Sequence, residues 1–129
     1  MTLTIPIRLT SRSNSRRHWS AQYREDKATK VAVLAMLGQH RAAQLPVVVT
    51  LTRVAPRALD VGDNLNASMK AVRDACAWWL LGRPRLANGK PAWGRGDDDP
   101  RITWRYAQRT GGVREYALVV DIQPGGRDG

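Results

Sequence analysis

The sequence predicts a single α+β domain, in which two main helices cover a small mixed β-sheet in the element order β-α-β-α-β-β. The chain has 129 residues, which is the length of one domain. Short β-branched runs that alternate apolar and polar residues are separated by two longer stretches with the apolar spacing of helices. The apolar residues recur in these patterns without repeats or low-complexity blocks, which argues against general disorder.

The first part of this pattern predicts a strand followed by a helix. Residues 3–9 alternate between apolar and polar positions, and Pro6 places this strand at an edge of the sheet. Residues 18–39 have helical spacing, and Gly38 suits the end of the helix. The side chains expected on one side of this helix are Trp19, Tyr23, Val33, Leu34 and Leu37.

The middle of the chain predicts a second strand and a second helix. Residues 47–54 form the most strongly β-branched run of the sequence, and Pro56 ends it. A loop at 58–62 follows. Asp63 then has the character of an N-cap for a helix that runs to about Leu81.

The last part predicts an irregular insertion and two strands. Residues 82–99 are rich in Gly, Pro and Arg, and an irregular stretch of that length is more often functional or disordered than neutral. Residues 102–106 and 116–122 alternate as strands do, and Gly111 and Gly112 between them are a hairpin signal.

The domain is expected to span residues 1–123, and residues 124–129 are expected to form a flexible tail. Cys76 is the one cysteine of the sequence, so it cannot form an internal disulfide, and a buried thiol in a reducing compartment is expected. The apolar runs are too short to cross a bilayer, and the N-terminal residues do not have the pattern of a secretory signal. No membrane partner and a cytoplasmic location are therefore expected.

Charge is the strongest compositional signal. The sequence has 21 Lys and Arg residues against 11 Asp and Glu residues, a formal net charge of +10 at pH 7. Basic proteins bind nucleic acid strongly because they release counterions from its phosphates, so a polyanionic partner is expected. The alternative is a basic protein that is merely soluble.

The acidic residues are unevenly placed. Six of the eleven lie in three places, which are Asp60 with Asp63, Asp74, and the triplet at 97–99. At about 100° per residue, Asp63, Lys70 and Asp74 fall within about 20° of one direction on the second helix. The apolar residues expected on its opposite side are Leu65, Met69, Val72, Cys76 and Leu80.

A divalent cation site is one interpretation of these acids. Mg²⁺ prefers carboxylate oxygens and is typically held by one or two carboxylates and substrate phosphates, whereas two His and one Cys do not make a zinc site. The ion would polarise a scissile phosphate, and Lys70 would add a fixed positive charge. In the alternative interpretation Asp63 caps a helix and Lys70 pairs with Asp74 at the surface. The triplet at 97–99 is then a solvated turn before Pro100.

Three segments of the sequence contain the clustered acids and Lys70 in a characteristic order. They are Leu59-Asp60-Val61-Gly62-Asp63-Asn64-Leu65, Lys70-Ala71-Val72-Arg73-Asp74 and Asp97-Asp98-Asp99-Pro100-Arg101-Ile102-Thr103-Trp104-Arg105-Tyr106-Ala107-Gln108. Together with Ser13-Asn14 and His18-Trp19, this order resembles the RusA family of Holliday junction resolvases, particularly its phage and prophage members. The resemblance extends from about residue 11 to residue 122.

The resemblance implies a homodimeric endonuclease that nicks four-way DNA junctions and depends on Mg²⁺, for which Mn²⁺ can substitute. It implies catalytic roles for Asp60, Asp63, Lys70 and Asp97. It also implies metal binding by Asp60, Asp63 and Asp97, with Asp98 as the next candidate in the triplet. The sequence departs from the family pattern at two points. Two residues separate Asp60 from Asp63 where one is common, and Lys70 lies further along its helix than in the best-known members.

Two basic segments are candidates for DNA contacts. The first comprises Arg12, Arg16, Arg17 and Arg24. It is either an arm that contacts phosphates or an ordinary solvated loop. The second comprises Arg83, Arg85, Lys90 and Arg95. It resembles a flexible basic flap in which the indole of Trp93 stacks on an unpaired base, unless Trp93 packs back onto the domain.

The function expected from these features is a Mg²⁺-dependent, structure-selective endodeoxyribonuclease that acts on branched DNA during recombination or repair. A basic nucleic-acid-binding module without catalysis explains the charge equally well. A basic protein associated with RNA or the ribosome is a third class, which would be indifferent to junction structure.

Overall fold

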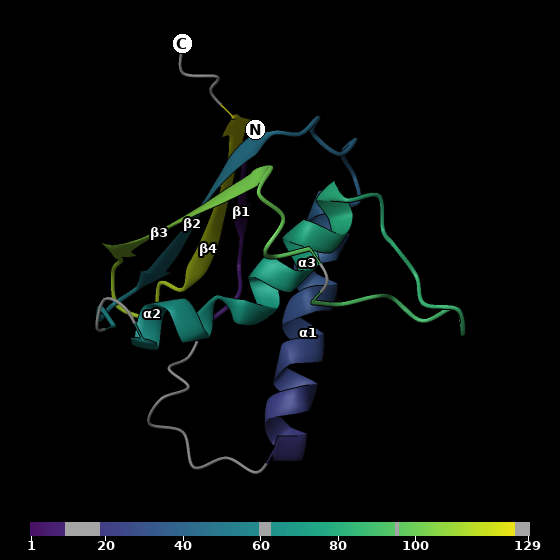
Figure 1. The fold of residues 1–129 in the computed structure, drawn as a ribbon. Helices are drawn as coiled ribbons and strands as arrows, with labels where there is room; N and C mark the ends of the chain where they lie inside the picture. The colour runs from purple at the N-terminus through teal and green to yellow at the C-terminus, as the bar shows by residue number, and fades with distance from the viewer. Residues whose placement is uncertain (10–18, 60–62, 95, 126–129) are drawn as a thin grey trace.

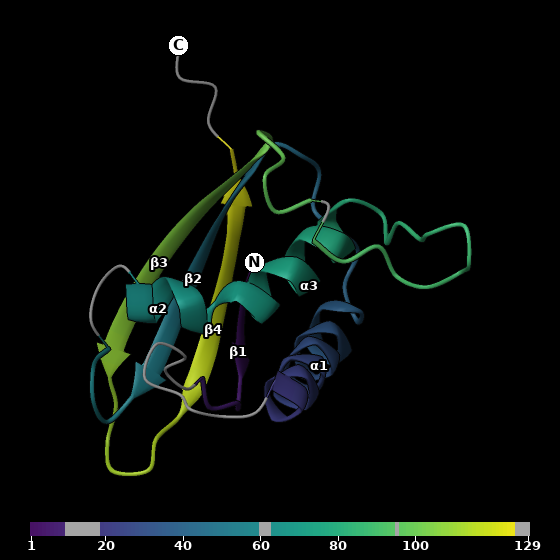
Figure 2. The ribbon, with the colours of Figure 1, turned by 60° about the horizontal axis from the view of Figure 1, so that its bottom comes forward.

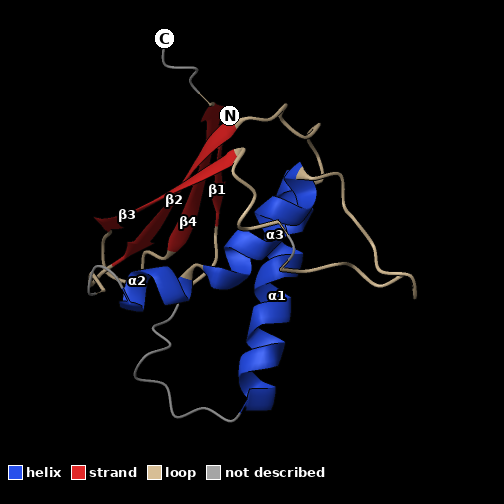
Figure 3. Cartoon of the chain, in the orientation of Figure 1, coloured by secondary structure: helices blue, strands red, loops and turns tan. Residues whose placement is uncertain are grey.

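The computed structural model describes residues 1–9, 19–59, 63–94 and 96–125 of the chain (Figure 1). It has the predicted α+β architecture in one small domain. Its elements in chain order are β1 (Thr2–Ile5), α1 (Trp19–Leu37), β2 (Val47–Ala55), α2 (Asp63–Ser68), α3 (Lys70–Leu80), β3 (Ile102–Thr110) and β4 (Ala117–Pro124). The four strands form one mixed sheet, and the helices lie on one side of it (Figures 1 and 3).

The strand order in the sheet is β1-β4-β2-β3. β2 pairs in parallel with β3 and antiparallel with β4, and β1 pairs antiparallel with β4. β1 ends at Ile5, directly before Pro6, and it is an edge strand as predicted. β3 is the opposite edge strand, so one side of its backbone has no neighbour within the sheet.

The predicted hairpin between the last two strands is wrong. β3 and β4 do not pair with each other, because β2 lies between them and bonds to both. The chain passes around the end of β2 after β3, where the N–H of Gly111 donates to the Ala55 carbonyl at 2.9 Å. The two glycines thus belong to a connection that passes the end of a central strand. The sequence pattern of such a connection is the same as that of a hairpin, so the sequence alone does not distinguish them.

The predicted single helix from Asp63 to Leu81 is also wrong, since it is divided into α2 and α3. At Met69, the N–H bonds to the Asn66 carbonyl three residues back, at 3.1 Å. The Ser68 hydroxyl donates to the Leu65 carbonyl at 2.7 Å, a local bond that competes with regular helical pairing. The angular positions expected for one continuous helix therefore do not hold across the break.

The sheet and the helices enclose one apolar core. The five apolar residues predicted for the inner side of the second helix are all buried, and they face alternate residues of β2, Val47, Val49 and Leu51. From α1, Val33 and Leu37 complete this core. The predicted inward position of Tyr23 is wrong, because its side chain is 64% exposed. The side chain of Trp19 lies outside the described residues.

The ends of the domain differ slightly from expectation. β4 includes Pro124, and the N–H of Gly125 donates to the Pro46 carbonyl at 2.8 Å, so the expected tail is ordered to residue 125. Residues 126–129 lie outside the described part of the chain. Within that part, no helix combines the length and the apolar character needed to cross a membrane.

Cys76 provides a test of the core. Burial of its thiol raises the pKa from about 9 to about 12. Above pH 9 the unfolded chain loses the thiol proton, whereas the native protein keeps it. The contribution of Cys76 to the free energy of unfolding is therefore complete below pH 9 and is lost as the pH rises toward 12. A Cys76→Ala variant, which loses buried volume, is expected to be less stable at pH 8 by about 1–2 kcal/mol.

The difference between the two proteins in the free energy of unfolding should shrink by more than about 1 kcal/mol between pH 8 and pH 11. Urea titrations at both pH values measure it. A difference that stays constant with pH would contradict a thiol held neutral by burial.

Candidate active site

Three side chains of β3 organise the candidate site. Trp104, Tyr106 and Gln108 occupy alternate positions of the strand, so they share the face that the helices cover. Ile102, two residues earlier on the same face, is buried in the core. We refer to Trp104, Tyr106 and Gln108 as the β3 row. Each member bonds to a different segment of the chain. These are the loop that contains Asp97, the helix that begins at Lys70, and the segment directly before Asp60.

The Trp104 indole fixes the loop before β3. Its Nε1–H donates to the backbone carbonyl of Asp97 at 2.9 Å. One residue earlier the loop runs against α3, and a Cβ on Gly96 would overlap the side chain of Leu81. The absence of a side chain at position 96 thus allows the close approach that brings Asp97 to α3.

The Asp97 carboxylate pairs with an arginine that sequence reasoning did not single out. Arg73 Nη2 donates to Asp97 Oδ2 at 2.8 Å, and Arg73 Nη1 donates to the Tyr106 hydroxyl at 2.9 Å. The guanidinium carbon also lies 5.7 Å from the centre of the Trp104 ring. The side chains of Arg73 and Asp97 are 28% and 20% exposed, so the ion pair is partly shielded while the carboxylate still reaches solvent.

The third member of the row holds the segment that leads to the first predicted acids. Gln108 Nε2 donates to the Leu59 carbonyl at 2.7 Å, and Gln108 Oε1 accepts the Leu59 N–H at 2.8 Å. Leu59 precedes Asp60 in the sequence. Asp60 itself lies outside the described residues, as does the side chain of Asp63, whose backbone begins α2.

The rest of the acidic triplet behaves differently from Asp97. Asp99 accepts the backbone N–H of Arg101 at 2.9 Å and pairs with its guanidinium, and these bonds lower the pKa of the Asp99 carboxyl to about 2. Asp99 therefore closes a turn, as the alternative interpretation of the triplet held. Asp98 is exposed. Of the three acids, Asp97 is the one that faces α3 and the β3 row.

Lys70 and Asp74 form an i,i+4 pair at the start of α3. Lys70 Nζ lies 3.8 Å from Asp74 Oδ2, and the Lys70 side chain is 63% exposed. Asp74 was predicted to share a direction with Lys70 and, in the alternative interpretation, to pair with it at the surface. The pair is present, but the surface position is wrong, because only 7% of Asp74 is exposed. It packs toward α1, where Lys30 Nζ lies 4.0 Å from the same oxygen. Among the described atoms, Asp74 Oδ1 is buried without a hydrogen-bond partner.

A second buried charge lies at the end of β2. Arg53, which pairs in register with Gln108, donates from Nε to the Leu9 carbonyl at 3.0 Å and from Nη1 to the Arg57 carbonyl at 2.8 Å. Burial, and then the charge of Arg8, lower the pKa of its guanidinium. Arg53 thus fixes the backbone at Leu9 and at Arg57, two residues before Leu59, and its position in a β-branched strand gave no signal of this role.

Four of the eight predicted DNA contacts lie within the described residues. Arg24, Arg83, Arg85 and Lys90 are exposed. The other four predicted contacts, Arg12, Arg16, Arg17 and Arg95, lie outside the described residues.

The insertion is not a free flap. Trp93 packs against Trp78 with ring centres 4.8 Å apart, and Trp78 Nε1 donates to the Pro84 carbonyl at 2.7 Å. Arg85 and Pro91 form a bridge that closes a short turn. The alternative in which Trp93 packs back onto the domain is therefore the one observed, and the prediction of a mobile indole that stacks on a base is wrong.

Among the described residues, which do not include Asp60, no three or more acidic, histidine or cysteine side chains lie together so that they could hold a metal ion. A scan against protein-family models and a search of curated protein sequences find no match for this chain. The function has to be inferred from the residues themselves.

Removal of one member of the β3 row tests its structural role. We expect Gln108→Leu to lower the free energy of unfolding by about 1–3 kcal/mol, because the backbone N–H and carbonyl of Leu59 lose their partners. The matched control is Gln123→Leu on β4, where the exposed amide bonds only to Asp121 among the described partners. Urea unfolding of both variants measures the effect. Equal losses of less than about 0.5 kcal/mol would contradict an anchoring role for Gln108.

Proposed function

We propose that this chain is a Mg²⁺-dependent endonuclease that nicks branched DNA, with four-way junctions as its substrate. The observation that carries the proposal is the β3 row. It binds Asp97 through its backbone, Arg73 through its guanidinium, and Leu59 directly before Asp60. Segments far apart in the sequence are thus attached to one edge strand, and each contains or adjoins a residue that the resemblance implies, which are Asp97, Lys70 and Asp60.

The donor set fits a hard divalent cation. Asp60, Asp63 and Asp97 would hold Mg²⁺ or Mn²⁺, with Asp98 as a further candidate, and carboxylate oxygens are the ligands these ions prefer. The Asp97 carboxylate is 20% exposed, so it is accessible to a ligand from solvent. When bound, the ion would polarise the scissile phosphate and lower the pKa of an attacking water.

The protein's own side chains would have distinct tasks. Arg73 is a positioning residue, because it orients the Asp97 carboxylate through a bond of 2.8 Å. Lys70 lies at the start of α3 with 63% of its side chain exposed, so its ammonium group can approach a phosphate while Asp74 limits where it moves. The buried Arg53 contributes a fixed positive charge at the end of β2.

The charge of the chain supports a DNA substrate. A net charge of +10 gives a long-range attraction to phosphates, and the exposed Arg24, Arg83 and Arg85 are available for backbone contacts. Two symmetric nicks require two sites, so a twofold homodimer is part of the proposal. A DNA substrate and a lone buried cysteine fit a location in the cytoplasm.

A nucleic-acid-binding module without catalysis is the second candidate. The observation that favours it is that Asp97 and Lys70 each have an ion-pair partner within the protein, Arg73 and Asp74. Such pairs explain these residues without any metal. The two candidates differ in their response to Mg²⁺, which would stabilise the fold only if it binds the native state.

Replacement of the acids tests the endonuclease. We expect Asp63→Asn and Asp97→Asn each to reduce nicking of a synthetic four-way junction in Mg²⁺ by about 100-fold or more, because each removes a carboxylate from the metal site. Binding of the junction in EDTA should be retained. Asp121→Asn is the control, since Asp121 bonds to Thr2 and Gln123 on the far side of the sheet and should leave nicking unchanged.

Undiminished cutting by Asp63→Asn would refute the assignment. A wild-type protein that binds junctions, but neither nicks them nor gains thermal stability with Mg²⁺ or Mn²⁺, would favour the binding module. Equal affinity for junction, duplex and hairpin RNA at one salt concentration would point to the RNA-associated class.

A further inference from the structure

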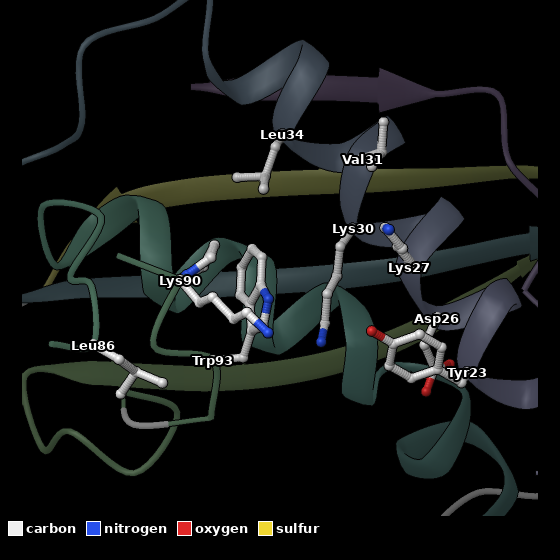
Figure 4. Close-up of a pocket in the computed structure, with 10 residues that line it drawn as sticks. Tyr23, Asp26, Lys27, Lys30, Val31, Leu34, Leu86, Lys90 and Trp93 are labelled. Carbon is white, nitrogen blue, oxygen red and sulfur yellow. The ribbon is translucent and has the colours of Figure 1, made fainter. Parts of the chain in front are cut away.

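A pocket of about 540 Å³ lies between α1 and the turn of the insertion (Figure 4). Its walls include Tyr23, Lys27 and Lys30 from α1 and Leu86, Lys90 and Trp93 from the insertion. The volume is within the range of small-molecule sites, which is about 300–1,000 Å³. The segment that forms its second wall was predicted as a basic flap, and its packing against α3 turns that segment into one side of a defined pocket.

The charges around this pocket are mainly positive. The sequence contains four lysines among its 21 basic residues, and three of the four line this pocket. Asp26 is the acidic residue in the lining, and its Oδ1 accepts a hydrogen bond from Gln22 Nε2 at 3.2 Å. Three ammonium groups around one small volume favour an anionic ligand.

The pocket also has an aromatic and apolar surface. Tyr23 is 64% exposed and Leu86 is 37% exposed, and both are large side chains that would be expected inside if they served the core alone. Trp93 is held from one side by Trp78, and Lys30 Nζ lies 4.8 Å from the centre of its ring. Tyr23 is therefore the ring that remains open to a planar ligand.

We propose that this pocket binds an unpaired nucleotide of single-stranded DNA. Its phosphates contact Lys27, Lys30 and Lys90, and its base stacks on Tyr23 with Leu86 beside it. Base stacking on aromatic side chains combined with lysine contacts to the backbone is the usual means of binding single strands without sequence preference. The inference rests on the proposed function, because DNA is taken as the polyanion.

The pocket is coupled to the candidate active site through one buried acid. Asp74 Oδ2 lies 4.0 Å from Lys30 in the pocket wall and 3.8 Å from Lys70 at the start of α3. A strand that leaves the branch point of a junction and enters the pocket would thus lie on the same side of α3 as Lys70. The pocket would hold an unpaired strand beside the site of nicking.

Lysine footprinting tests the pocket directly. The protein is acetylated with and without a single-stranded oligothymidylate in EDTA, and modification at each lysine is measured by mass spectrometry. We expect Lys27 and Lys90 to be protected several-fold. The N-terminal amine, which bonds to the Ile122 carbonyl and does not line the pocket, should react at the same rate in both samples. Equal protection of all amines, or none at Lys27 and Lys90, would overturn the proposal.

A pair of double variants separates the pocket from general electrostatics. The double variant Lys27→Gln and Lys90→Gln is expected to bind a fluorescent oligothymidylate about tenfold more weakly. The salt slope, which is the slope of the logarithm of the binding constant against the logarithm of the salt concentration, should decrease in magnitude by about 1.4. Arg105→Gln with Arg109→Gln removes the same charge from the outer face of β3, where both residues are exposed, and should have a clearly smaller effect. Equal effects of the two pairs would overturn the pocket.

The stacking ring has its own variant. Tyr23→Leu keeps the charge and lies at an exposed position, and it is expected to weaken binding about fivefold or more with no change in the salt slope. Unchanged affinity would overturn the role of Tyr23. All these measurements are made without metal and without nicking, so failure of the endonuclease assay leaves them valid, and their failure leaves the Asp63 and Asp97 variants informative.

Discussion

The candidate site depends on the fact that β3 is an edge strand with three bonding side chains on its inner face. Trp104, Tyr106 and Gln108 alternate along β3, and each bonds to a segment that has no other regular pairing with the sheet at that point. The central strand β2 has core residues along most of its inner face, but its Arg53, in register with Gln108, bonds to the Leu9 and Arg57 carbonyls in a similar way. The same three side chains thus set the spacing between the loop of Asp97, the helix of Arg73 and the segment of Leu59. Figure 2 shows α2 lying in front of β3 and β2, while α3 continues past β4 toward the side of α1.

Asp74 links the candidate active site and the pocket electrostatically. Its separations from Lys30 and Lys70, 4.0 and 3.8 Å, are too long for hydrogen bonds, so attraction between charges rather than specific geometry holds the three groups together. A buried carboxylate requires nearby positive charge, and the interface between α1 and α3 supplies it from both sides. The position of Lys30 above Trp93 follows from the same arrangement, because the lysine lies between the acid and the ring. The wall of the pocket and the start of α3 are therefore parts of one charged cluster.

Local patterns in the sequence predicted most elements of the fold, while the pairing of distant segments was beyond them. Residues 47–54 and the core side of the second helix were predicted correctly, because alternation and helical spacing report burial directly. The hairpin across Gly111 was wrong because a glycine pair is compatible with any tight connection, and only the insertion of β2 between the last two strands decides the topology. Asp74 was misplaced because α1 packs against α3 on the side opposite the sheet, and helical spacing within α3 does not show that a second helix covers that side. In the site, Asp97 was singled out from the sequence, whereas Arg73 and Gln108 were not, because their partners are 24 and 49 residues away.

Charge balance within the described cluster limits how a cation can be held. Asp97 is neutralised by Arg73, and Asp74 has Lys30 and Lys70 beside it, so these two acids add no net negative charge to the region. A divalent ion beside them meets three or more positive groups, which oppose its binding unless further carboxylates compensate. Asp60 and Asp63 are the two acids of the segment that follows Leu59, and together they carry the charge that one Mg²⁺ would balance. The metal affinity of the proposed site would thus come mainly from these two acids. Asp97, whose charge is balanced by Arg73, would mainly fix the position of one ligand oxygen.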